Sequence, residues 1–282
     1  MRVAILASPR SGNSWLRVLL AETLELPEFT THNWHEVIGQ VPDSCVMQVH
    51  WYREPGIQMF LRDNGFRIVT VARHPLDILL SALRFCKHDP NNARWLEGNC
   101  EIECLFDKNV TPENTVFLDW CAGFGCENLL SVTYQWFHER EAVKVHYEDL
   151  VANPRGTVDA IAYDLAGKKL SVSNATLKKF DLPYWKSLPN QHGWQGKAGL
   201  WKEFYTTESC AAIRERHRRV FDTLGYDVEG VCASNTAATI SEKWKALNPE
   251  KAAAEASPNG PVPAAATSHN RFRFFSGILA NR

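Results

Sequence analysis

The sequence has no apolar run of the roughly 20 residues that a membrane-spanning helix needs. It also has almost no net charge, because 31 Lys and Arg are balanced by 32 Asp and Glu, for a formal charge of −1. This balance argues against nucleic-acid binding through a global basic field, so any anion site has to be local. No charged and apolar leader precedes the first predicted strand, and we therefore expect a cytoplasmic protein.

The eight cysteines contain no Cys-x-x-Cys pair, the spacing typical of structural zinc sites. Although Cys86, Cys100 and Cys104 lie near one another in the sequence, as do Cys121 and Cys126, we expect no metal site. Disulfide frameworks are typical of short secreted chains, and this chain is mid-sized. The sequence therefore predicts reduced and mostly buried thiols.

The first chemical signal is a loop close to the N-terminus. Residues 2–7 are almost continuously apolar and predict a strand, and a helical pattern resumes after a loop of small residues. Gly12 lets the backbone approach an anion, Asn13 or Ser14 is expected to cap the new helix, and Arg10 adds a positive charge. The Gly-Lys-Ser/Thr of a Walker A sequence is missing, and an ordinary strand-to-helix turn is the alternative interpretation.

Three further apolar runs predict buried strands that end at chemically useful residues. The run 45–49 ends at His50, the run 67–72 ends at Arg73, and a fourth strand covers 142–147. In an open α/β sheet, ligands bind beyond the carboxyl ends of the strands. We therefore expect these side chains to lie near the first loop.

The remaining patterns complete an α/β domain that we place at residues 1–230, with a central parallel sheet flanked by helices. Helical patterns cover 57–64, the residues after Pro75, 112–138 with a break near 123–125, 157–166, 173–180 and 208–224. The stretches 27–44, 87–111 and 182–195 are predicted to be irregular. Residues 231–282 form a C-terminal extension with a short helix at 241–247 and predicted disorder around 248–270, which is rich in Ala, Pro, Asn and Ser.

The loop Pro9-Arg10-Ser11-Gly12-Asn13-Ser14-Trp15 resembles the 5′-phosphosulfate loop of the sulfotransferases that use 3′-phosphoadenosine 5′-phosphosulfate (PAPS). That family usually has Pro-Lys-Ser-Gly-Thr-Thr-Trp there. Three more segments match in the family's order: Arg73, Pro75, Asp77 and Ser81 of the 3′-phosphate segment; Tyr147-Glu148-Asp149-Leu150; and 196–206, similar to the loop that closes over the nucleotide. Together the matches span residues 8 to 206.

The resemblance implies a single domain related to the P-loop nucleotide kinases. It also implies transfer of the sulfuryl group of PAPS to an acceptor hydroxyl by in-line displacement, with adenosine 3′,5′-bisphosphate (PAP) as product and no metal. Tyr147 and Trp15 would lie by the adenine. The co-substrate-binding residues that it implies are Arg10, Ser11, Gly12, Asn13, Ser14, Trp15, Arg73, Ser81, Tyr147, Lys197 and Gly199.

Two catalytic roles follow from this chemistry. A base must take the proton of the acceptor, and His50 suits this task because the pKa of an imidazole is ordinarily near 6.5 and the family has its His at this place. Glu54 is the alternative base. Arg10 replaces the family's usual Lys; a guanidinium forms forked hydrogen bonds to oxyanions but is a poor proton donor, so we expect it to stabilise the leaving group.

Departures from the family pattern leave alternatives open. Gln48 stands where the family often has Lys, and Trp194 and Gln195 stand where it has an Arg-Lys pair, which Lys197 could replace. A non-catalytic PAPS-binding protein and, with less support, a P-loop small-molecule kinase are the rival functions. The acceptor is expected to be a small molecule or a glycan; the polar, Trp-containing character of 27–44 and 87–135 favours a polar alcohol or carbohydrate over a phenol or sterol.

Overall fold

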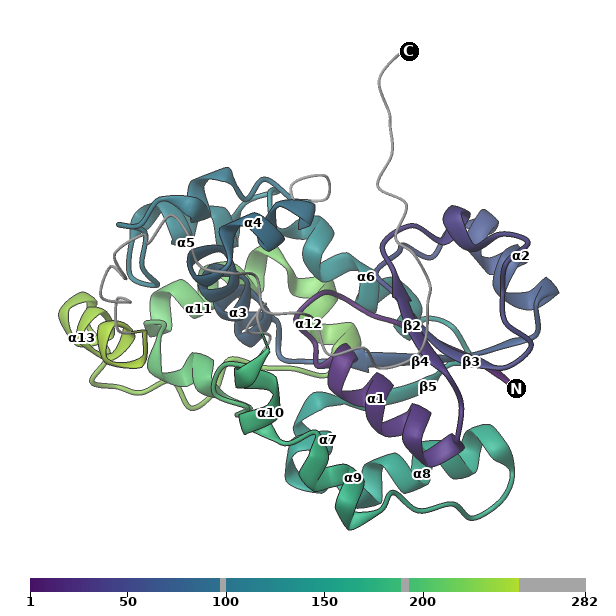
Figure 1. Ribbon diagram of the computed structural model, residues 1–282. Helices are drawn as coiled ribbons and strands as arrows, with labels where there is room; N and C mark the ends of the chain where they lie inside the picture. The colour runs from purple at the N-terminus through teal and green to yellow at the C-terminus, as the bar shows by residue number, and fades with distance from the viewer. Residues whose placement is uncertain (97–99, 189–192, 249–282) are drawn as a thin grey trace, which may run out of the picture. The chain divides into compact units, whose positions relative to one another are not determined.

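A parallel β-sheet is the centre of the protein. The computed structural model describes residues 1–96, 100–188 and 193–248 (Figure 1). The strands lie in the order β2-β3-β1-β4-β5, with bounds β1 Arg2–Leu6, β2 Glu28–Thr31, β3 Cys45–Val49, β4 Phe66–Ala72 and β5 Val143–His146. Every neighbouring pair is parallel, so all the carboxyl ends meet at one edge. The predicted fold class is confirmed.

Strand β2 lies in a stretch that the sequence predicts to be irregular. It has only four residues, of which three are polar and two are exposed, and it pairs with β3 alone, with Thr30 opposite Gln48. An edge strand of this kind needs neither two buried faces nor a long apolar run, so it has almost no hydrophobic pattern. This is why the sequence did not reveal it.

Helices cover both faces of the sheet. The helices α1 (Asn13–Leu24) and α8 (Pro154–Ala166) pack on one face, and α2 (Pro55–Asp63) and α6 (Glu127–Phe137) pack on the other (Figure 1). Alternate residues of β1 reach the two faces: Val3 and Ile5 pack with α1 and α8, and Ala4 and Leu6 pack with α2 and α6. Burial on both faces explains why β1 is a continuous apolar run.

A third core lies beyond the sheet, around a helix that is buried over most of its length, α3 (Pro75–His88). The remaining α-helices of the described chain are α4 Pro90–Ala93, α5 Thr115–Ala122, α7 Tyr147–Ala152, α9 Asn174–Lys179, α10 Leu182–Ser187, α11 Thr207–Arg216, α12 Arg218–Leu224 and α13 Ala237–Leu247. The expected pair of helices in 112–138 is confirmed as α5 and α6. The expected single helix at 208–224 is wrong, because it is interrupted at His217, and α10 lies where an irregular chain was expected.

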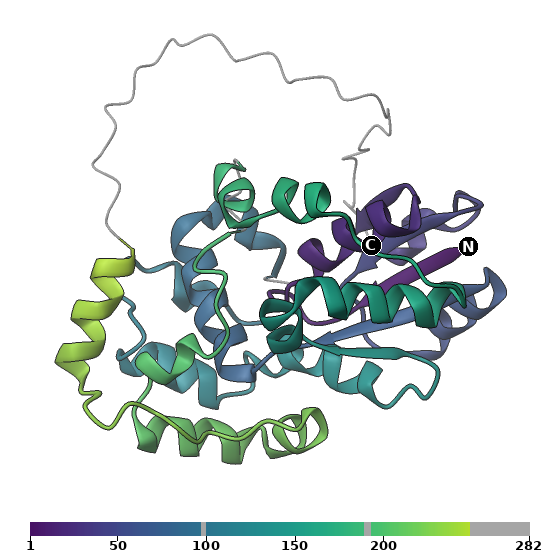
Figure 2. The same ribbon diagram turned by 90° about the horizontal axis from the view of Figure 1, so that it is seen from below.

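The compact unit extends to Asn248 and not only to residue 230, because α13 is part of it. Trp244 of α13 packs edge-on against Trp194 at 5.7 Å and against Phe204 at 5.9 Å between ring centroids. Figure 2 shows α13 at the side of this unit that is remote from the N-terminus. Trp194, which stands where the resemblance expects a basic residue, is therefore a core residue that anchors α13. The rest of the predicted extension lies outside the described residues.

The cysteines are free thiols, and six of the eight are buried, as predicted. Among the residues that the structure describes, no three His, Cys, Asp or Glu side chains are grouped as a metal site would require. No helix of the described chain is both long and apolar enough to cross a membrane.

Candidate active site

The loop between β1 and α1 is tied to α6 by a reciprocal pair of hydrogen bonds. The N–H of Ser8 donates to Oγ1 of Thr133 at 2.7 Å, and the N–H of Thr133 donates to Oγ of Ser8 at 3.2 Å. Two loop residues are left-handed, Arg10 with φ 68° and Gly12 with φ 92°. For a residue with a side chain this conformation costs about 1–2 kcal/mol, a cost typical of functional loops.

The helix that follows the loop has no side-chain cap, contrary to the expectation for Asn13 or Ser14. Gly12 is the N-cap of α1, and the amide of Asn13 turns back to donate to the carbonyl of Ser8 at 2.8 Å. Asn13 therefore closes the loop on itself. The N–H groups of the first turn of α1 have no capping side chain, which is the arrangement that binds anions at helix N-termini.

Gly12 lies directly against the ring of Tyr147. A Cβ added at Gly12 would lie 2.6 Å from Cδ2 and 2.8 Å from Cε2 of Tyr147. The left-handed backbone and the close contact both require glycine here. The first loop and the residue after β5 thus form one surface.

Replacing Gly12 with alanine is therefore expected to destabilise the protein and to weaken PAP binding. The positive φ and the overlap with Tyr147 together should lower the free energy of unfolding by about 1–3 kcal/mol. Urea unfolding and calorimetric PAP binding measure the two effects. Gly39→Ala is a matched control, because Gly39 also has a positive φ but no atom within 4 Å of an added Cβ. Equal losses in both variants would contradict a special role for the Tyr147 contact.

Arg73 joins the segments that the resemblance singles out. Its Nη1 donates to the carbonyl of Arg10 at 2.9 Å, and its Nη2 donates to the carbonyl of Lys197 at 3.5 Å. Its guanidinium also lies over the ring of Tyr147, 4.5 Å from the centroid. The first loop, the end of β4, the end of β5 and the C-terminal loop therefore meet at one buried cation.

Asp77 fixes the C-terminal loop onto α3. Its carboxylate accepts hydrogen bonds from the N–H of Gly199 at 2.8 Å and from the N–H of Trp201 at 2.9 Å. Burial raises the pKa of Asp77, and the nearby Arg73 and these two N–H groups oppose that rise. The resemblance names Asp77 only as part of the 3′-phosphate segment, whereas the structure uses this carboxylate to anchor the loop.

Asp77→Asn is expected to weaken PAP binding by roughly tenfold or more, because hydrogen bonds to a charged group are worth about 1.5–3 kcal/mol. The amide retains one acceptor oxygen but leaves one loop N–H without a partner. Calorimetric titration with PAP measures this loss, and Asp119→Asn, at an exposed carboxylate, is the control. An Asp77→Asn variant that binds PAP like the control would show that the loop does not depend on Asp77.

The side chain of Arg10 lies against α3. Its Nε donates to Oγ of Ser81 at 3.1 Å, and its guanidinium lies 4.7 Å from the centroid of the Phe85 ring. Burial, followed by repulsion from Arg84 and Arg73, lowers the pKa of Arg10 to about 9, which leaves it charged at neutral pH. Three guanidinium groups that repel one another favour a bound polyanion, which would relieve the repulsion.

His50 lies against the same loop, at Ala7. Its Nδ1 is 2.7 Å from the carbonyl of Ala7, and its Nε2 is 3.2 Å from the amide nitrogen of Gln48. Burial lowers the pKa of His50 to about 4, because the surrounding protein disfavours the charged ring. The ring is half-buried and is neutral at physiological pH.

Glu54, the alternative base, is exposed and already has a partner. Its carboxylate accepts a hydrogen bond from the indole nitrogen of Trp51 at 2.6 Å. It is not among the residues that line the pocket beside His50. The geometry therefore favours His50.

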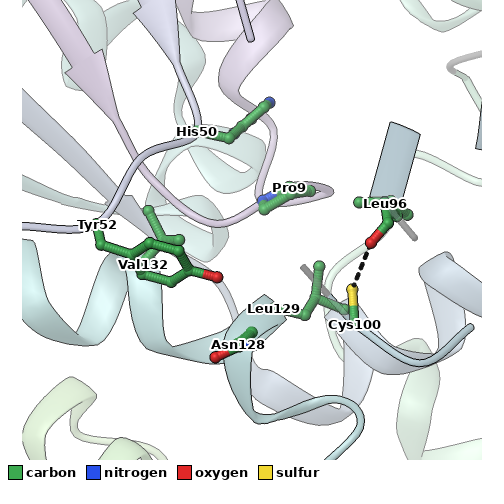
Figure 3. Close-up of a pocket in the computed structure, with 8 residues that line it drawn as sticks. All are labelled: Pro9, His50, Tyr52, Leu96, Cys100, Asn128, Leu129 and Val132. Atoms are coloured by element: carbon green, nitrogen blue, oxygen red, sulfur yellow. Dashed lines mark hydrogen bonds between the residues drawn. The ribbon is translucent and has the colours of Figure 1, made fainter. Parts of the chain in front are cut away.

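A small pocket opens beside His50 (Figure 3). It encloses about 240 Å³ of empty space, open mouth included. Its lining residues are Pro9, His50, Tyr52, Leu96, Cys100, Asn128, Leu129 and Val132. Five of them are apolar or weakly polar, and Figure 3 shows them on the loop, on α6 and around Cys100.

The other predicted residues fit a nucleotide to different degrees. Ser11 Oγ and Trp15 Nε1 are buried and lack a hydrogen-bond partner within the described chain, so both have a donor to offer a ligand. Ser14 is half-buried in the first turn of α1, and Lys197 is exposed on the C-terminal loop. The N–H of Gly199 already donates to the carboxylate of Asp77, so the contribution of this glycine is to hold its loop in place.

Two residues that shape the site were not predicted. Arg84 lies three residues after Ser81, so helical spacing could have placed both on one side of α3. Thr133 lies 125 residues from its partner Ser8, and its hydrogen bond has no sequence signal.

The fold of the chain is similar to that of solved structures. The chain is similar to the crystal structure of mouse sulfotransferase SULT7A1 complexed with PAP, with a TM-score of 0.54 and 14% identity over 78% of this chain and 84% of that one. This chain has the sulfotransferase fold. It is also similar to retinol dehydratase in complex with androsterone and the inactive cofactor PAP, with a TM-score of 0.50 and 15% identity over 81% and 83% of the two chains. No protein-family model and no curated protein sequence matches the chain.

Proposed function

We propose that this chain is a PAPS-dependent sulfotransferase that transfers the sulfuryl group to an acceptor hydroxyl. One observation carries the proposal: the proposed base and the cations proposed to bind the nucleotide both contact the same short loop. The carbonyl of Ala7 is bound by His50, and the carbonyl of Arg10, three residues later, is bound by Arg73. A neutral imidazole and a cluster of cations thus flank one anion-binding loop, as in-line transfer between an acceptor and a nucleotide requires.

The nucleotide would be bound by residues from all the matched segments. Arg73 and Ser81 would bind the 3′-phosphate, and the backbone and hydroxyl groups of residues 11–14 would bind the 5′-phosphosulfate. Tyr147 and Trp15 would lie by the adenine. The loop that contains Lys197 and Gly199, anchored through Asp77, would cover the nucleotide and exclude water.

His50 would act as the general base at Nε2. It accepts the proton of the acceptor hydroxyl as the oxygen of that hydroxyl bonds to sulfur and the bond from sulfur to the bridging oxygen of the nucleotide breaks. Arg10 would stabilise the negative charge that develops on that bridging oxygen. The positive charge comes from the protein itself, so the proposed reaction assigns no role to a metal.

The pocket favours an acceptor with an apolar body. The sequence favours a polar alcohol or carbohydrate, but most of the lining beside His50 is apolar. Tyr52 and Asn128 supply polar groups that could orient the acceptor. A small phenol or alcohol fits this lining better than a glycan.

The rival function is a non-catalytic PAPS-binding protein. It is motivated by Gln48, Trp194 and Gln195, which replace basic residues of the family pattern. In the structure Trp194 packs in the core, so its change from a basic residue has a structural reason. A P-loop kinase has less support, since the loop lacks Gly-Lys-Ser/Thr.

A transfer assay tests the proposal. The purified full-length chain is incubated with sulfur-35-labelled PAPS and separate panels of small phenols, aliphatic alcohols, sterols and glycans, and PAP binding is measured by calorimetry. We expect PAP binding and transfer to phenols or alcohols with an apolar body. PAP binding without transfer to any acceptor would support the non-catalytic function, and Mg²⁺-dependent ATP turnover without PAP binding would support the kinase.

A further inference from the structure

We infer that Gln48 is a positioning residue for His50, and that the ion pair between Arg17 and Glu28 fixes the orientation of its amide. The inference rests on the proposed function in one respect, which is the role of His50 as the base. The positioning itself is a property of the chain without any ligand.

A chain of polar contacts connects three elements to the imidazole. Nε of Arg17 on α1 lies 2.6 Å from a carboxylate oxygen of Glu28 on β2. Nη1 of Arg17 donates to Oε1 of Gln48 on β3 at 3.2 Å. The amide nitrogen of Gln48 lies 3.2 Å from Nε2 of His50, whose Nδ1 lies 2.7 Å from the carbonyl of Ala7. Gln48 is only 5% exposed and the side chain of Arg17 14%, so the contact between them is made inside the protein, whereas the side chain of Glu28 is 38% exposed.

These contacts determine where the protons lie. A guanidinium has only donors, so the amide atom of Gln48 that faces Arg17 is the oxygen. The NH₂ group then faces His50 and donates to it, so Nε2 of His50 accepts. The carbonyl of Ala7 can only accept, so Nδ1 of His50 carries the proton. Arg17 thereby selects the tautomer in which Nε2 is unprotonated; the lone pair of Nε2 accepts from Gln48 until an acceptor hydroxyl takes the place of that NH₂ group.

The same arrangement disfavours protonation of His50. A proton on Nε2 would face the NH₂ group of Gln48, and the amide could offer its oxygen only by breaking its bond to Arg17. Arg10 of the loop, Arg17 of α1 and His32 after β2 act on the ring from the neighbouring elements, and all three favour its neutral form. Tyr52 and Cys100 line the same pocket, and burial raises the pKa of each to about 12, so neither is charged at neutral pH. Glu28, the nearby carboxylate, is paired with Arg17.

The departure from the family pattern at position 48 therefore has a consequence of its own. A lysine there would bring one more positive charge to a cluster that already contains Arg10 and Arg17. Gln48 provides a donor to the imidazole without adding charge. Its effect on the chemistry is exerted through His50, which is what distinguishes it from a residue that binds the nucleotide.

Histidine NMR tests the inference directly. The full-length chain, labelled with nitrogen-15 at histidine, is titrated with acid without nucleotide or acceptor, and the His50 signal is assigned by its loss in His50→Asn. We expect a single Nδ1–H tautomer and a pKa far below 6.5. Gln48→Glu places a carboxylate at Nε2 and should raise the pKa of His50 by about one to three units. Gln40→Glu, at an exposed glutamine, is the matched control.

Arg17→Lys separates orientation from charge. Lysine keeps the positive charge but lacks the fork that contacts Glu28 and Gln48 together, so the amide can rotate and present its oxygen. The pKa of His50 should rise in this variant also, and Nδ1–H should cease to be the single tautomer. An unchanged pKa and tautomer in both Gln48→Glu and Arg17→Lys would overturn the inference.

Two safeguards make the outcome decisive. If circular dichroism shows that Gln48→Glu does not fold, Gln48→Met is used in its place. Methionine removes the NH₂ donor at similar volume, so Gln48→Met should also raise the pKa of His50. The titration uses no PAPS, so it is independent of the transfer assay. If the pKa of His50 shifts as expected but no acceptor is sulfated, the proposed function is refuted and the positioning role of Gln48 stands. If an acceptor is sulfated but the pKa of His50 does not shift in the variants, the positioning role is refuted and the proposed function stands.

Discussion

His50→Ala is expected to lower kcat by about two to four orders of magnitude, the usual contribution of a general base. PAP affinity should remain as in the unsubstituted chain, because the described hydrogen bonds of His50 join it to Ala7 and Gln48. Steady-state transfer at saturating PAPS, together with calorimetric PAP binding, measures both quantities. The pH profile of kcat/KM adds a second measurement: a neutral base is active above its pKa, so activity should fall only as the pH approaches about 4.

Glu54→Gln is the matched control for this experiment. Its carboxylate is exposed and bound to Trp51, so its loss should change kcat little. Near-normal turnover by His50→Ala combined with a large loss in Glu54→Gln would show that the carboxylate is the base. An acid limb at pH 6.5 would contradict the buried, neutral imidazole described above.

Arg10→Met is expected to lower kcat by about two to three orders of magnitude, the typical cost of removing one group that stabilises charge in the transition state. Methionine keeps much of the apolar stem that lies by Phe85 but removes the guanidinium. PAP affinity should fall less than kcat, since Arg73 remains in place. Single-turnover transfer and PAP calorimetry separate the two effects.

Arg10→Lys is the control, because it keeps the charge and restores the residue that is usual in the resembling family. It should retain much more activity than Arg10→Met, although it loses the forked geometry. If Arg10→Met turns over normally while Arg84→Met does not, the charge on the leaving group is stabilised from α3 and not from the loop.

The sequence predicted the fold from features that are local. Buried parallel strands are continuous apolar runs, so β1, β3 and β4 were visible. The edge strand β5 was visible from its alternating Val143 and Val145, whereas the edge strand β2 was not. The loop 8–14 and the residues after each strand were recognised because glycine, charge and strand ends coincide there. Their assembly in the structure at one sheet edge follows from parallel pairing.

What the sequence could not supply is the partner of each polar group. Asp77 was visible as a helix residue, but its role depends on N–H groups more than 120 residues away. Gln48 looked like the loss of a cation, and its contact with His50 became visible only with the position of Arg17. Polar contacts between residues far apart in the sequence follow no periodic pattern, so they could not be predicted from the sequence.

The contacts of Arg73 also bear on how the protein folds. This one side chain binds carbonyls that are 63 and 124 residues away in the chain, so its site exists only after distant segments have come together. Loop-closure entropy makes contacts of such separation late and slow to form. A nucleotide that needs this site would bind the native state and not partly folded chains, and its binding energy would add to the stability of the whole unit.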